Sequence, residues 1–113
     1  MINIQKNRDF LLSEIEKIHT KSFFSNLRVP KLIAVSKKQQ DYKIDKAIEC
    51  GQKFYGENRV QEASLRWKER IKIYKDLELR LIGPLQTNKV KESLNLFDVI
   101  ETIDREKLAL EII

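Results

Sequence analysis

Residues 32–37 read LIAVSK, an apolar run that ends in a lysine. This stretch follows Pro30, whose missing amide hydrogen is tolerated just before a strand begins, and it predicts a buried strand over residues 32–36. Lys37 is therefore expected at the tip of that strand, where its amine is a candidate nucleophile. A solvated surface lysine is the other reading in so basic a chain, and both readings stay open here.

Two later stretches repeat the pattern of a short apolar run that leads into a helix. They read FYGENRVQE at residues 54–62 and LIGPLQTNK at residues 81–89. An amphipathic helix over about the first twenty residues is expected to precede four strands and the helices between them. The predicted strands cover residues 32–36, 54–55, 79–83 and 97–100. Strands that alternate with helices at this spacing predict an α/β fold with a parallel sheet and right-handed crossovers.

The helices between these strands have recognisable ends and apolar stripes. Asp41 is a predicted N-cap, and Gly51 is placed to end the same helix in a left-handed conformation. One long helix is predicted over residues 60–74, with Trp67 and Tyr74 in the core. Asp104 is the predicted cap of a last helix. These residues are therefore assigned to structure and not to chemistry.

The ends of the predicted strands carry polar residues that can act together. Lys37, Asn58 and Gly83 all fall at or just past such ends, and functional groups gather at this edge of parallel α/β folds. Glu57 and Asn58 could orient a ligand through a carboxylate or an amide, although Asn58 is also a predicted helix N-cap. Gly83 could permit a close backbone approach, but a simple turn with the following proline is favoured. One shared site is the prediction.

Composition narrows the classes of function. The 113 residues fit one small domain, and the formal charge of +5 comes from basic residues interleaved with acids, which does not favour a dedicated nucleic-acid role. The single Cys50 excludes an internal disulfide, and with the single His19 it cannot supply four zinc ligands. No catalytic metal is expected. The polar N-terminus lacks the apolar stretch of a secretory signal, and no stretch is long enough to span a membrane, so the expected location is the cytoplasm.

Four segments together resemble the pyridoxal phosphate homeostasis protein family. They are AVSK at residues 34–37, YGENRVQE at 55–62, IGPLQTNK at 82–89 and FDVI at 97–100. That family is similar in fold to the N-terminal barrel of alanine racemase. The resemblance covers nearly the whole chain and implies that residues 1–113 form the N-terminal half of a TIM-type (β/α) barrel that binds pyridoxal 5'-phosphate (PLP).

The resemblance also implies roles for individual residues. Lys37 corresponds to the lysine that holds the cofactor as an internal aldimine, and Asn58 to an asparagine close to the cofactor. Arg80 departs from the family, since relatives usually have histidine before the Ile-Gly pair. Lys38 and Gln39 replace a more usual threonine-containing segment.

The function implied is cofactor buffering or delivery without catalysis, in PLP homeostasis. A racemase-type enzyme would need a second proton-transferring residue, and none is evident in the motifs. That enzyme, or a remnant that binds no cofactor, remains the alternative. A complete barrel takes about 250 residues. An isolated half would leave open strand edges, so a second half-barrel chain or self-association is the expected partner.

Overall fold

The computed structural model describes residues 3–22, 26, 28–101, 110 and 112. Helices and strands alternate along the chain after a long N-terminal helix, as the sequence pattern predicts. In chain order the elements are α1 (Ile4–Thr20), β1 (Ala34–Val35), α2 (Asp41–Glu49), β2 (Phe54–Glu57), α3 (Val60–Trp67), α4 (Arg70–Ile73), β3 (Glu78–Leu81), the 3-10 helix η1 (Thr87–Lys89), α5 (Val90–Leu96) and β4 (Val99–Ile100). The predicted cap Asp104 lies outside the described residues.

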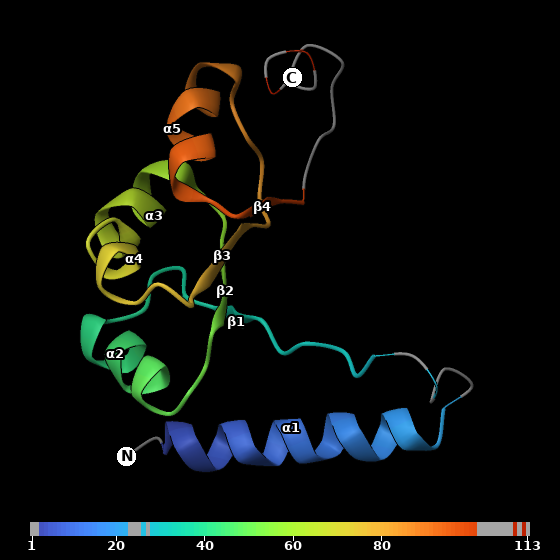
Figure 1. The fold of residues 1–113 in the computed structure, drawn as a ribbon. Coiled ribbons are helices and arrows are strands. Elements are labelled where there is room, and N and C mark those ends of the chain that lie inside the picture. The colour runs from blue at the N-terminus through green and yellow to red at the C-terminus, as the bar shows by residue number, and fades with distance from the viewer. Residues whose placement is uncertain (1–2, 23–25, 27, 102–109, 111, 113) are drawn as a thin grey trace.

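The four strands form one parallel sheet in the order β1-β2-β3-β4, so each strand pairs with the next one along the chain. Figure 1 shows α2, α3, α4 and α5 on the same side of this sheet. Helices on a single face, with strands added in sequence order, are the arrangement of a (β/α) barrel, whereas a doubly wound sheet has helices on both faces. The predicted fold class, part of a (β/α) barrel after an N-terminal helix, is confirmed.

The core lies between the sheet and these helices. Tyr55, Leu79 and Leu81 point to the helix side at alternate strand positions, and each is at most 1% exposed. Trp67 of α3 is fully buried, and its ring centroid lies 4.5 Å from that of Tyr55. Side chains on the opposite face include Val35, which is 45% exposed. Among the described residues, no helix covers that face (Figure 1).

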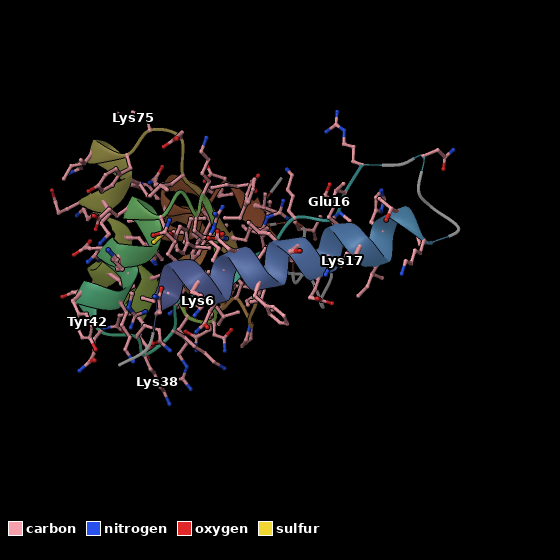
Figure 2. All side chains as sticks on the ribbon, turned by 90° about the horizontal axis from the view of Figure 1, so that it is seen from below. Lys6, Glu16, Lys17, Lys38, Tyr42 and Lys75 are labelled. Carbon is pink, nitrogen blue, oxygen red and sulfur yellow. The ribbon has the colours of Figure 1, made fainter. Side chains whose placement is uncertain are left out.

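Helix α1 lies beside α2, below β1 in the view of Figure 1. The side chain of Asn3 accepts a hydrogen bond from the Lys6 amide at its start, and the Arg8 guanidinium donates to Gln52 Oε1 at 2.9 Å, just before β2. Much of its apolar stripe is uncovered, because Ile18 is 67% exposed. Figure 2 shows α1 from below as a straight rod that reaches beyond the rest of the fold. In the described part of the chain, no helix has the length and apolarity needed to cross a bilayer.

The predicted helix over residues 60–74 is in fact two helices, α3 and α4. The Arg70 guanidinium at the start of α4 bonds the carboxylates of Asp41 and Asp45 on α2, which fastens this second helix to its neighbour. Tyr74 was predicted in the core, and this is wrong, because the backbone turns extended at this residue and leaves it 38% exposed. Trp67 is buried as predicted.

The predicted element ends are partly corrected. Gln40 occupies the N-cap of α2, and Asp41 falls in its first turn. Arg59, not Asn58, is the N-cap of α3. Gly51 has φ +94°, which confirms the left-handed end predicted for α2. The two strands at the sheet edges, β1 and β4, are shorter than predicted.

Candidate functional site

Lys37 lies two residues beyond β1, at the carboxyl edge of the sheet. Its neighbour Ser36 is buried and donates its amide to the Gly56 carbonyl of β2 at 3.0 Å, so β1 is held up to the residue before the lysine. Lys38 then takes φ 58°, the only positive value among the described non-glycine residues. A left-handed residue of this kind costs roughly 1–2 kcal/mol. The chain therefore turns sharply away from the sheet immediately after Lys37.

The side chain of Lys37 is exposed, but it is not isolated. It borders a cavity of about 390 Å³ that is lined by Lys37, Lys38, Asn58, Arg59 and Glu62. The sequence placed Lys37 and Asn58 at the ends of neighbouring strands, and the structure brings both to this one cavity. The covalent role of Lys37 and the contact of Asn58 with a cofactor stay predictions.

A buried polar cluster ties together the elements under this cavity. The carboxylate of Glu57, at the end of β2, is 0% exposed and accepts hydrogen bonds from the Ser36 hydroxyl and from Trp67 Nε1. Arg66 Nη1 lies 2.7 and 2.8 Å from its two oxygens. Because the cluster joins the ends of β1 and β2 to α3, it fixes the backbone from which Lys37 extends.

The sequence analysis predicted that the carboxylate of Glu57 could orient a ligand. The structure turns this side chain into the helix layer, and it is not among the residues that line the Lys37 cavity. The alternation of strand side chains was the missed signal, because Glu57 shares a face with the buried Tyr55 two residues earlier.

Gly83 makes the close backbone approach that sequence reasoning ranked below a simple turn. A Cβ atom at Gly83 would lie 2.3 Å from the Asn58 carbonyl oxygen and 2.8 Å from the Asn58 Cα. Only glycine allows the chain after β3 to pass so near this residue. The Ile82 amide also donates to the Glu57 carbonyl at 2.9 Å. Gly83 therefore helps to set the position of Asn58 at the cavity.

Arg80 is engaged away from the cavity. It pairs with Glu78 at 3.1 Å and with Glu101 at 3.2 Å, and it is not part of the Lys37 cavity wall. Burial by itself lowers the pKa of Arg80, but hydrogen bonds and charge from Glu78 and Glu101 outweigh it and raise the pKa above its ordinary value. The residue that departs from the family pattern is thus held by carboxylates on the uncovered face.

Other cavities and polar residues lie elsewhere in the described part of the chain. A larger cavity of about 520 Å³ includes Gly51, Lys53 and Asp76 in its wall, at the end of the sheet where β2 begins. Cys50 is half-buried and His19 is buried near the end of α1. Within the described ranges, no three His, Cys, Asp or Glu side chains are grouped so as to hold a metal ion.

The fold and the site define the class: part of a (β/α) barrel with a lysine and an asparagine at the carboxyl ends of its first two strands. No family model matches the sequence. The pyridoxal phosphate homeostasis protein of Buchnera aphidicola subsp. Baizongia pistaciae is 40% identical over 110 residues, which cover 97% of this chain and 47% of that protein. The protein of the same name from Vibrio cholerae is 38% identical over 114 residues, which cover 99% and 48%.

These matches show that the chain is similar to the N-terminal half of pyridoxal phosphate homeostasis proteins. It spans about half the length of the curated relatives it matches. Among solved structures, PipY of Synechococcus elongatus PCC7942 with PLP bound aligns with a TM-score of 0.78 at 31% identity. That alignment covers 97% of this chain and 46% of PipY. The resemblance read from the four sequence segments is therefore confirmed.

Proposed function

We propose that this chain binds PLP and serves in PLP homeostasis in the cytoplasm, by holding or delivering the cofactor without catalysis of its own. The supporting observation is that Lys37 and Asn58 meet at one cavity in a chain whose relatives carry this name and whose neighbour PipY has been solved with PLP bound. Lys37 is the proposed covalent anchor. Its amine condenses with the aldehyde carbon, forming a C=N bond and releasing one water.

The cavity fits such a ligand in size and in charge. Its volume of about 390 Å³ lies within the roughly 300–1,000 Å³ typical of small-molecule sites. Asn58 adds an amide that can both donate and accept hydrogen bonds. Lys37, Lys38 and Arg59 outnumber the single carboxylate of Glu62 in the wall. The net positive charge suits a phosphorylated aldehyde.

Residues 1–113 are proposed to form the N-terminal half of an alanine racemase-like PLP-binding barrel, completed by a second half-barrel chain or by self-association. Among the described strands, β1 pairs only with β2 and β4 only with β3. A largely apolar cavity of about 210 Å³ lies beside the β1 edge, with Ile4, Val35 and Ile44 in its wall. Open parallel edges and uncovered apolar surface favour further pairing. Light scattering of the purified chain would measure its mass, and a monomer at all concentrations would contradict self-association.

Borohydride trapping tests the covalent role of Lys37. The native chain mixed with PLP should show a visible absorbance band, and reduction should leave a single main adduct by intact mass. Lys37→Ala should lose the band and that adduct. Lys75→Ala is the matched control, because Lys75 is an exposed lysine at the opposite edge of Figure 2 from Lys38, and it should retain both.

Three results would separate the alternatives. No band with the native chain, or equal labelling of the native chain and Lys37→Ala, would contradict PLP binding at Lys37 and favour a remnant that binds no cofactor. Turnover of amino acids by the PLP-loaded chain, lost in Lys37→Ala, would instead favour a racemase-type enzyme. The proposed non-catalytic role predicts trapping without turnover.

A further inference from the structure

Ser36, the residue before Lys37, is fixed through its backbone and its side chain. Its amide donates to the Gly56 carbonyl at 3.0 Å, and its carbonyl accepts the Gln39 amide at 3.1 Å. Its hydroxyl donates to the Glu57 carboxylate. Only 3% of Ser36 is exposed, so the hydroxyl is shielded from water. Hydrogen bonds therefore hold the residue from which the chain passes into Lys37.

Lys37 and Lys38 are the two central residues of a tight turn that begins at Ser36. The bond from the Gln39 amide to the Ser36 carbonyl closes this turn. A positive φ at the third turn residue is usually taken by glycine or asparagine, but here Lys38 takes it with φ 58°. Strained residues of this kind persist only where the surrounding structure holds them, and they are frequent at ligand sites. The conformation around Lys37 therefore depends on how firmly Ser36 is anchored.

The Ser36 hydroxyl also links the two strand ends that supply the Lys37 cavity. Ser36 immediately precedes Lys37, and its bonding partner Glu57 immediately precedes Asn58. Trp67 Nε1 of α3 donates to both partners, at 3.1 Å to the Ser36 hydroxyl and at 2.9 Å to the Glu57 carboxylate. The hydroxyl is therefore a side-chain contact through which the position of Lys37 is set relative to Asn58.

We infer that Ser36 is a positioning residue for the condensation at Lys37. Its hydroxyl holds the strained turn in the conformation that keeps the Lys37 amine at the cavity it shares with Asn58. Condensation forms a C=N bond and releases one water, and its rate depends on how often the amine lies within reach of the aldehyde carbon. Ser36 acts through Lys37 and is not part of the cavity wall. This inference rests on the proposed PLP binding.

The test measures how fast PLP condenses with Lys37 when the hydroxyl is removed. Stopped-flow absorbance follows the visible band, and borohydride trapping confirms that the adduct is on Lys37. Ser36→Ala should lower the rate constant by about tenfold or more. Ser36→Thr, which keeps a hydroxyl, should restore most of it. Acylation of the Lys37 amine by acetic anhydride, which needs no binding site, should proceed equally in all three chains, because Lys37 stays exposed.

Ser93→Ala is the matched control, because Ser93 is also a buried serine, but its hydroxyl has no hydrogen-bond partner among the described residues. It should keep the native rate constant. Urea unfolding followed by Trp67 fluorescence identifies a condition in which every variant is fully folded. Condensation measured under that condition then compares folded chains only.

Hydrogen exchange tests the turn in the absence of any ligand. The Gln39 amide bonds the Ser36 carbonyl, so Ser36→Ala should speed its exchange by about tenfold. Exchange at the Leu79 amide of β3, which bonds the Asp98 carboxylate at 2.8 Å, should stay as in the native chain. A faster exchange at Gln39 alone supports a local hold on the turn, whereas a general loss of stability would raise both rates.

The outcomes separate this inference from the proposed function. A native band with PLP whose rate constant Ser36→Ala leaves unchanged would overturn the positioning role alone. Unchanged exchange at Gln39, or an equal rise at Gln39 and Leu79, would overturn it as well. If the native chain forms no band with PLP, the proposed function and this inference fail together.

Discussion

Replacing Glu57 by glutamine should strongly destabilise the chain. The native carboxylate is fully buried and accepts hydrogen bonds from Ser36, Trp67 and Arg66. A neutral amide leaves the Arg66 charge without its partner and turns an NH₂ group toward hydrogen-bond donors. Breaking a buried ion pair from one side typically costs about 3–5 kcal/mol. Arg66 keeps 14% exposure, so the expected loss for Glu57→Gln is near the lower end, about 3 kcal/mol.

Urea unfolding followed by tryptophan fluorescence measures this loss. Trp67 is the only tryptophan in the chain and donates directly to Glu57, so the signal reports on the affected cluster. With a slope of about 1–3 kcal/mol per molar urea, Glu57→Gln should lower the unfolding midpoint by about 1 M or more. Glu69→Gln is the control, because the Glu69 side chain is 78% exposed and pairs with Lys72 only at the surface. Its expected effect is below about 0.5 kcal/mol.

A double-mutant cycle tests whether the lost stability comes from the ion pair between Glu57 and Arg66. Arg66→Met should destabilise the chain by itself, but the double variant Glu57→Gln/Arg66→Met should lose less than the sum of the two single effects, because the orphaned charge is gone. If Glu57→Gln shifts the midpoint no more than Glu69→Gln, the buried carboxylate is not paired as the structure shows. Strict additivity in the cycle would contradict the direct contact.

Gly83→Ala should cost about 1–3 kcal/mol of unfolding free energy, because its new Cβ would meet the rigid backbone of Asn58 at 2.3 Å. Gly56→Ala, whose Cβ would meet flexible side-chain atoms first at 2.9 Å, should cost less in the same urea assay, and the reverse order would contradict the close-approach reading. Burial raises the pKa of the Tyr55 hydroxyl above its ordinary 10.0, so the hydroxyl loses its proton in the unfolded state at a lower pH than in the folded state. The free energy of unfolding should therefore fall as the pH rises above about 10, by up to about 1.4 kcal/mol per pH unit. Tyr55→Phe should flatten this alkaline decline in unfolding measurements from pH 8 to 11. Tyr42→Phe is the control, because Tyr42 is 66% exposed, and it should keep the decline of the native chain. Equal pH profiles for the two variants would contradict the assignment of the decline to Tyr55.

Local patterns were enough to predict the order of the elements. The apolar run before Lys37 and the two later strand-helix junctions each depend on residues close together in sequence, and hydrophobic periodicity is a short-range signal. Element ends were less accurate. At the start of α4, Arg70 contacts Asp41 and Asp45, which lie 29 and 25 residues away. No local pattern contains that contact.

For the candidate site as well, the sequence predicted some features and missed others. The sequence indicated that Lys37 and Asn58 lie at strand ends, and parallel pairing of β1 with β2 then brings them to one cavity. The sequence did not reveal that Arg59 borders two cavities, because the walls of these cavities combine residues from separate parts of the chain. It also ranked a simple turn at Gly83 above the close backbone approach that the structure shows, since the decisive neighbour, Asn58, comes from another strand end.

By itself, the sequence determined the α/β class, the chain order of strands and helices, and the placement of a lysine beyond the first strand. Hydrophobic periodicity and turn residues act within a few positions, so they can be read directly. Only the tertiary structure decided that Glu57 turns inward to Ser36, Trp67 and Arg66, and that Gly83 passes against Asn58. Such contacts join separate elements, and they exist only once packing has chosen which faces meet.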